Sequence, residues 1–179
     1  GNRFHVVIMG YDADSSNHSN KTMKLKICKL HENAVVPTYA TDGSACFDLT
    51  ASTVAGYNTI GKHVEPNAPI TCGTGLAFEV PQGHVMLVFS RSGHGFKNGV
   101  RLSNCVGVID SDYRGELLVQ LTQDDRLETH GYDLASTFIK PGERVAQAMV
   151  LPVQQVSFEV AEQLSITDRG IGGPGSTGK

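Results

Sequence analysis

Short apolar runs separated by turn sequences constrain the fold of this chain more than any other feature. From Met23 onward, the runs that resemble strands are Lys24–Leu30, Ser44–Ala51, Pro69–Val80, His84–Ser90, Val100–Ile109, Glu116–Thr122 and Arg144–Val156. Asp-Gly, Asn-Gly and Pro-x-Gly sequences lie between them and supply a preset or positive φ. Lys97-Asn98-Gly99 is the clearest hairpin signal. The pattern predicts an all-β sandwich, jelly roll or barrel.

The remaining segments complete the predicted organisation. Ser90–Phe96 is compatible with one short helix, and Gln154–Ser165 is ambiguous. Thr53–Val64 and Gln123–Phe138 are polar and are predicted to be surface loops. Residues 1–22 precede a natural-looking start at Met23 and are expected to be a cloning-derived or disordered extension. We therefore expect one β-domain over residues 23–166, followed by a glycine-rich segment over residues 167–179.

Composition restricts the classes of partner. The chain has 179 residues, 40% of them hydrophobic, enough for one core. Its formal net charge of −3 and the lack of a basic run make it a poor candidate for binding long nucleic acid, although a local cluster can still bind a short phosphorylated ligand. The four cysteines form no CxxC pair, which predicts small buried side chains in a reducing compartment, consistent with the cytoplasm. Their spacing, with that of the histidines, argues against zinc. No apolar run is long enough to span a membrane.

The last eleven residues, Arg169 to Lys179, include five glycines and do not suit a packed helix or strand. Their backbone N–H groups, together with the hydroxyls of Ser176 and Thr177 and two cationic side chains, suit a polyphosphate. A frayed terminus is the alternative. We expect the segment to become ordered over a phosphorylated ligand.

Four further segments carry polar residues beside apolar strands. Ser90–Gly95 offers a helix start, an arginine and a hydroxyl for phosphate, or is a plain turn. Gly107–Gly115 places two carboxylates, a tyrosine and an arginine after a strand. Either carboxylate can accept a proton from water or hold a metal, or it is simply solvated in a turn. Gly142–Gln147 opens a strand that polar residues interrupt, as at a sheet edge. Asp48 lies within a strand, where it needs an arginine or a hydrated metal as partner.

With the tail, these segments resemble, in order, the five motifs of the trimeric dUTP pyrophosphatases (dUTPases). The segments are Gly43–Ala51, Arg91–Gly95, Asn104–Glu116, Gly142–Gln147 and Arg169–Gly178. The likeness extends from Met23 to Lys179. It implies a jelly-roll-like β-barrel that forms a homotrimer with shared active sites. It also implies cleavage of dUTP, with Mg²⁺, into dUMP and pyrophosphate, which keeps uracil out of DNA and supplies dUMP for thymidylate synthesis.

The resemblance also implies a role for each matching residue. Asp110 would be the general base that deprotonates the attacking water, and Tyr113 would pack against the deoxyribose and exclude a 2′-hydroxyl. Asp48 would reach the metal through water or hold an arginine in place. The other implied substrate-binding residues are Asn104, Gly107, Val108 and Ile109 at the uracil edge, and Arg91, Ser92, Gly93 and Gln147 at the phosphates.

In the tail, Arg169, Gly175, Ser176 and Thr177 would close over the β and γ phosphates. Here the sequence departs from the family, because Pro174 stands where the family has an aromatic residue that stacks on uracil. Proline supplies an apolar face without a π surface, so the lid is expected to work mainly through its phosphate donors. Gln123–Phe138 is also longer than the compact bacterial connection.

Two other functions are compatible with the sequence. A dCTP deaminase shares the fold, but the pairing of Asp110 with Tyr113 and the Gly-Ser-Thr-Gly tail favour dUTP. A second alternative adds a regulatory role, in which the Gln123–Phe138 loop binds a protein partner. An ordinary solvated loop fits that composition equally well.

Overall fold

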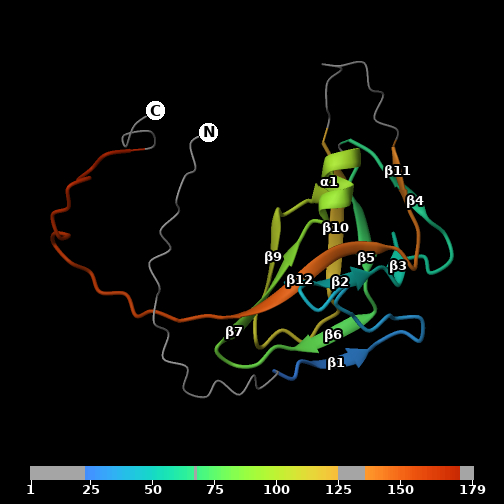
Figure 1. The fold of residues 1–179 in the computed structure, drawn as a ribbon, viewed down its shortest axis with the longest axis horizontal. Coiled ribbons are helices and arrows are strands. Elements are labelled where there is room, and N and C mark those ends of the chain that lie inside the picture. The colour runs from blue at the N-terminus through green and yellow to red at the C-terminus, as the bar shows by residue number, and fades with distance from the viewer. Residues whose placement is uncertain (1–22, 67, 125–135, 174–179) are drawn as a thin grey trace, which may run out of the picture.

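Residues 23–66, 68–124 and 136–173 are described by the computed structural model. Within these ranges the chain consists of short strands and one helix, α1 (Ser92–Asn98), as Figure 1 shows. The strands are β1 Lys26–Lys29, β2 Phe47–Thr50, β3 Thr53–Val54, β4 Lys62–Val64, β5 Ile70–Gly73, β6 Leu76–Glu79, β7 His84–Phe89, β8 Val100–Leu102, β9 Val106–Ile109, β10 Leu118–Gln123, β11 Thr137–Ile139 and β12 Arg144–Pro152. The all-β prediction is confirmed.

Two four-stranded sheets form the body of the molecule, with strand orders β2-β12-β7-β9 and β3-β5-β10-β8. Strands β1 and β6 form a two-stranded sheet, and so do β11 and β4. Successive residues of a strand point to opposite faces, so β10 buries Val119 and Leu121 while Leu118 and Gln120 are exposed. One apolar core contains Leu49 and Met86 from the first four-stranded sheet and Ile70 and Leu121 from the second.

The cysteines do not all behave as expected. Cys72 on β5 is buried in the core, and this burial raises the pKa of its thiol to about 12. Cys28 and Cys105 are exposed, however, so the prediction of small buried side chains is wrong for these two residues. The exposure of Cys28 follows from its place on β1, where only Ile27 is half-buried. Cys28 is the next residue along the strand, so its side chain points to the opposite, exposed face.

Three local predictions need correction. The segment predicted as the loop Thr53–Val64 contains β3 and β4, and the one predicted over Gln123–Phe138 includes the start of β11. These strands have two or three residues each, which is too short to show periodicity. Lys97-Asn98-Gly99 is not a hairpin turn but the end of α1, with Gly99 at φ 65° as the left-handed C-cap.

Two of the predicted runs each divide into a pair of strands. Pro69–Val80 breaks at Thr74-Gly75, where Gly75 has φ 69°, and Val100–Ile109 breaks at Ser103–Cys105.

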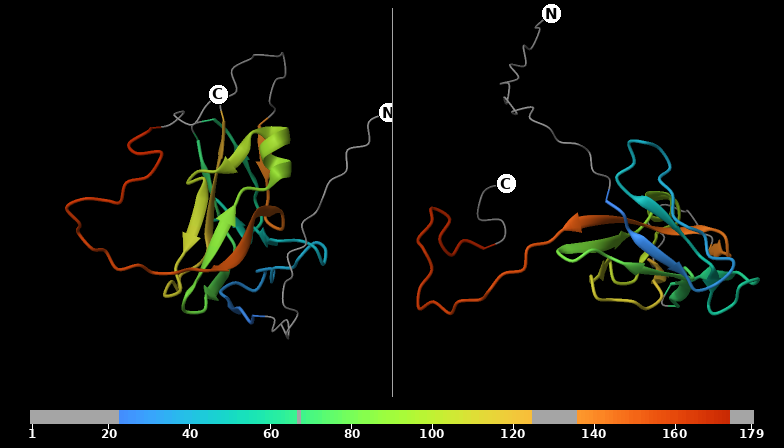
Figure 2. Two further views of the ribbon diagram at one scale, coloured as in Figure 1. Left: turned by 60° about the vertical axis from the view of Figure 1, so that its left-hand side comes forward. Right: turned by 90° about the horizontal axis from the view of Figure 1, so that it is seen from below.

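After β12, residues 153–173 run away from the barrel without forming a helix or strand (Figures 1 and 2). Among the described residues, none of the helices has the length and hydropathy needed to cross a membrane.

Candidate active site

Strand β12 brings three of the predicted site residues together. It lies between β2 and β7, and its Gln147 is in register with Asp48 on one side and with Phe89 on the other. Arg91 follows two residues after Phe89, at the turn that leads into α1. Gln147 is therefore on an interior strand rather than at a sheet edge, and its side-chain amide donates to the carbonyl oxygen of Ser90 at 3.0 Å.

Asp48 has two arginine partners. Its Oδ1 accepts from Nε of Arg91 at 3.2 Å, and its Oδ2 accepts from Nη1 of Arg144 at 2.9 Å. The Asp48 side chain is only 18% exposed, so these ion pairs stabilise a carboxylate that is largely removed from water. Two guanidinium groups face one carboxylate, which leaves a surplus positive charge on this surface.

These side chains line a cavity of about 460 Å³, which we call the arginine cavity; Ser92 and Gly93 from the start of α1 also line it. The first N–H groups of a helix have no acceptor within the helix, so they and the arginines suit an anion. Cys46 lies in the same cavity, and burial, together with the charge of Asp48, raises the pKa of its thiol. A neutral thiol does not compete with an anion for these donors.

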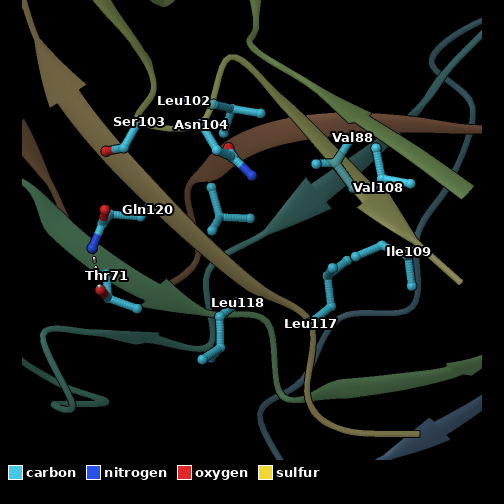
Figure 3. A pocket seen from close by; sticks show the side chains of 12 residues that line it. Thr71, Val88, Leu102, Ser103, Asn104, Val108, Ile109, Leu117, Leu118 and Gln120 are labelled. Atoms are coloured by element: carbon cyan, nitrogen blue, oxygen red, sulfur yellow. Dashed lines mark hydrogen bonds between the residues drawn. The ribbon is translucent and has the colours of Figure 1, made fainter. Parts of the chain in front are cut away.

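A second cavity, of about 350 Å³, lies beside the turn that joins β8 to β9. Asn104, Gly107, Val108 and Ile109 line it, as Figure 3 shows for the labelled side chains among them. Gly107 faces Val88 across the β7–β9 pair, and a Cβ built on Gly107 would lie 3.1 Å from the Cβ of Val88. A side chain at position 107 would therefore crowd β7 at the edge of this cavity.

Asp110 follows directly after β9 and is exposed. Its carbonyl oxygen accepts from the backbone N–H of Tyr113 at 3.2 Å, which closes a tight turn. Asp110 and Asp112 both line a third cavity, of about 720 Å³, together with His84 at the start of β7. The exposed carboxylate can meet water at this cavity and accept a proton from it.

The arginine cavity and Asp110 lie at opposite ends of β7. Ile109 is in register with Met86, so Asp110 lies level with the beginning of this strand, whereas Arg91 follows its end. The six residue steps of extended chain from Val85 to Arg91 span roughly 20 Å. One copy of the chain therefore does not bring Asp110 to the groups gathered around Arg91.

The tail residue Arg169 is far along the exposed segment that leaves the barrel. Its Nε donates to the carbonyl of Gly172 at 3.3 Å, so its described contacts are local to the tail. Residues Gly175, Ser176 and Thr177, and Pro174 before them, lie outside the described residues. The same applies to residues 1–22 and to most of the predicted 123–138 loop.

Sequence reasoning did not identify Arg144 as a partner of Asp48, although Gly142–Gln147 was recognised as a motif. Its position beside β2 follows from the pairing of β12 with β2, which no local pattern reveals. Glu116 was also missed. Its carboxylate accepts from the backbone N–H of Gly75 at 2.7 Å, and its carbonyl accepts from the Tyr113 hydroxyl at 2.9 Å.

Comparison with solved structures supports the same fold. The Staphylococcus bacteriophage 80alpha dUTPase with dUPNHPP superposes with a TM-score of 0.72 at 28% sequence identity, covering 88% of this chain and 100% of the phage chain. A dUTPase from phage phi11 of S. aureus, at 23% identity and a TM-score of 0.65, has the same fold.

The family model named dUTPase matches residues 32–178. The deoxyuridine 5′-triphosphate nucleotidohydrolase of Nautilia profundicola is 42% identical over 157 residues, which cover 88% of this chain and 100% of that protein. The enzyme of the same name from Bordetella avium is 41% identical over 162 residues, covering 89% of this chain and 99% of its own length. Since the match spans nearly the whole β-domain and all five motifs, the chain belongs to the dUTPase family of hydrolases.

Proposed function

We propose that this chain hydrolyses dUTP to dUMP and pyrophosphate at sites shared between the subunits of a homotrimer. The observation that carries the proposal is the separation of Asp110 from the arginine cavity along β7. Asp110 and the arginine cavity are about 20 Å apart in one chain. They can act on one substrate molecule only if different copies of the chain supply them.

In this mechanism Asp110 takes a proton from a water molecule as the water oxygen attacks the α-phosphorus. The new P–O bond forms as the bond from that phosphorus to the α–β bridging oxygen breaks, and pyrophosphate leaves. The exposure of Asp110 at its cavity supports this role, since the carboxylate is accessible to water. Asp112 is only two residues away, and the resemblance assigns the base to Asp110 alone.

The phosphates are assigned to the arginine cavity of a neighbouring copy. Arg91, Ser92 and Gly93 supply a guanidinium and helix-start N–H groups, and Gln147 lines the same wall. Phosphoryl transfer depends mainly on positioning and on charge stabilisation, which such donors provide. From a further copy, Arg169, Gly175, Ser176 and Thr177 would complete the enclosure of the β and γ phosphates.

The uracil ring is assigned to the cavity beside Asn104. Strand β9 is the last strand of its sheet in the described part of the chain, so the outer side of Val106–Ile109 has no strand partner there. Backbone N–H and C=O groups on a free strand edge match the alternating acceptors and donor of uracil. The side-chain amide of Asn104 adds one further donor and acceptor at the same cavity.

We assign Mg²⁺ as the cofactor, held chiefly by the substrate's own phosphates. Within the described ranges no group of three or more His, Cys, Asp or Glu side chains is placed to hold a metal ion. This fits Mg²⁺, which commonly binds through phosphates, waters and one or two carboxylates. Both oxygens of Asp48 already accept from arginines, so Asp48 reaches the ion through water without breaking either ion pair. The ion would neutralise charge on the triphosphate.

The exposed segment after β12 supports the homotrimer. Val156, Phe158 and Val160 alternate with polar residues, and Phe158 is 94% exposed within one copy. An exposed segment in which apolar and polar residues alternate needs a partner surface for its apolar side chains. A neighbouring copy supplies that surface and brings the glycine-rich tail to a shared site.

Release of pyrophosphate from dUTP, dTTP, dCTP and UTP tests the activity. We expect rapid release from dUTP and slow release from the other three. The family match disfavours deamination of dCTP, and ammonia release from dCTP without pyrophosphate would overturn the proposal. The regulatory role suggested for Gln123–Phe138 stays a prediction. A pull-down with and without dUTP, using the parent and a variant trimmed in this loop, tests it.

A further inference from the structure

The ring of Tyr113 lies directly against the backbone of Gly115. A Cβ built on Gly115 would lie 2.5 Å from the phenolic oxygen, 2.7 Å from Cζ and 3.1 Å from Cε2. Real Cβ atoms do not approach other heavy atoms so closely, so either the ring or the turn would have to move. The φ of Gly115 is outside the left-handed region, so the backbone itself would accept alanine. Glycine is needed here for the close approach of the ring.

A hydrogen bond accompanies this contact at the tip of the ring. The phenolic hydroxyl of Tyr113 donates to the carbonyl of Glu116 at 2.9 Å. The carboxylate of Glu116 is itself anchored on the backbone N–H of Gly75 in the turn between β5 and β6. The phenolic end of the ring therefore lies against Gly115 and is tied to the barrel through Glu116, yet Tyr113 remains 43% exposed.

From this contact we infer that Gly115 is a specificity-determining positioning residue for the sugar of the substrate. The inference rests on the proposed function, in which the ring of Tyr113 excludes a 2′-hydroxyl. A ring whose phenolic end lies against Gly115 presents its exposed part at one fixed height above the turn. A methyl group at position 115 would displace the ring and break its bond to Glu116. The size of residue 115 thus sets how closely the ring approaches the sugar.

The first test is Gly115→Ala, with kcat/KM measured on dUTP and on UTP. We expect the preference for dUTP over UTP to fall on the order of tenfold, because small misfits in a packed pocket change discrimination by such factors. Gly56→Asn is the control: Gly56 has φ 84° with nothing within 4 Å of its built Cβ, and asparagine tolerates that conformation. The preference of Gly56→Asn for dUTP over UTP should equal that of the parent.

A double-mutant cycle separates positioning from general damage. In a Tyr113→Ala background the ring is absent, so Gly115→Ala should leave the dUTP-over-UTP preference unchanged. If Gly115→Ala lowers activity on both nucleotides equally, or acts equally in both backgrounds, the assignment is wrong. A parent enzyme that releases no pyrophosphate from dUTP would instead overturn the proposed function itself.

If Gly115→Ala does not fold, the preference for dUTP over UTP is measured in Tyr113→Phe instead. Phenylalanine loses the bond to Glu116 but keeps the ring on the glycine, so the preference should stay close to that of the parent. A fall to the level of Tyr113→Ala would show that the hydroxyl anchor, not the contact with Gly115, positions the ring, and would overturn the inference.

Discussion

Asp48 and Arg91, which are 43 residues apart in sequence, form an ion pair at the wall of the arginine cavity, with 3.2 Å between Oδ1 and Nε. Both side chains are largely buried, at 18% and 25% exposure. The guanidinium of Arg91 is held at two points, because Nε donates to this carboxylate and Nη1 donates to the carbonyl oxygen of Arg144 at 3.3 Å. Asp48 also holds Arg144, so one carboxylate orients both cations.

We expect Asp48→Asn to lower kcat/KM for dUTP by on the order of 10–100-fold, the same range as the loss of a residue that orients a metal ligand. The amide cannot balance two guanidinium charges. Asp124→Asn is the matched control, because Asp124 forms a half-buried ion pair with Arg101 at 2.8 Å that does not line the arginine cavity. Steady-state kinetics of the two variants tests this. Equal losses would mean that Asp48 has no special role.

Asp110→Asn should lower kcat by on the order of 10²–10⁴-fold, because an amide keeps the shape of the side chain but cannot take the proton from water. Binding of a non-hydrolysable dUTP analogue, measured by calorimetry, should change little. Asp112→Asn is the control from the same turn and cavity, and it should remain active. A severe loss with Asp112→Asn and none with Asp110→Asn would move the base to Asp112.

We expect sedimentation to show a trimer of the 19.2 kDa chain. Phe158→Asp should weaken assembly and activity together, because it places a charge on the apolar face of the exposed segment. Glu159→Gln changes the neighbouring residue on the opposite side of an extended chain and should leave the trimer intact. A fully active monomer would refute the shared-site model.

Deleting residues Gly172 to Lys179 should lower turnover severely and leave the trimer intact. The deletion removes the hydroxyls of Ser176 and Thr177, while the apolar part of the exposed segment stays. Hydrogen bonds to charged groups contribute roughly 1.5–3 kcal/mol each, so affinity for a non-hydrolysable dUTP analogue should fall more than affinity for dUMP. Unchanged affinity and turnover would show that the tail is only a frayed end.

Pro174→Phe should leave dUTP affinity unchanged or tighten it. An aromatic ring at this position would add stacking worth about 0.5–1.5 kcal/mol beyond its buried area. Titration with the same dUTP analogue, beside Pro174→Ala as a non-aromatic control, measures the effect. If phenylalanine weakens binding and alanine does not, the tail of this chain follows a different path over the base.

The β-class of the fold and the order of the five motifs were readable from the sequence, because alternation and turn chemistry act between neighbouring residues. The burial of Leu49 on β2 and of Leu121 on β10 agrees with such alternation. The two-residue β3 and the helix end at Gly99 did not follow, because elements that short carry no period, and because Asn-Gly serves hairpins and helix caps alike.

Only the tertiary structure decided which of these residues meet. Pairing of β12 with β2 and β7 places Asp48, Arg144 and Gln147 around Arg91, and pairing of β7 with β9 sends Asp110 to the other end of the same strand. The contact of Tyr113 with Gly115 likewise depends on Glu116 and its anchor at Gly75. Strand register sets such distances through long-range hydrogen bonds and shared core packing, and neither is encoded within a window of neighbouring residues.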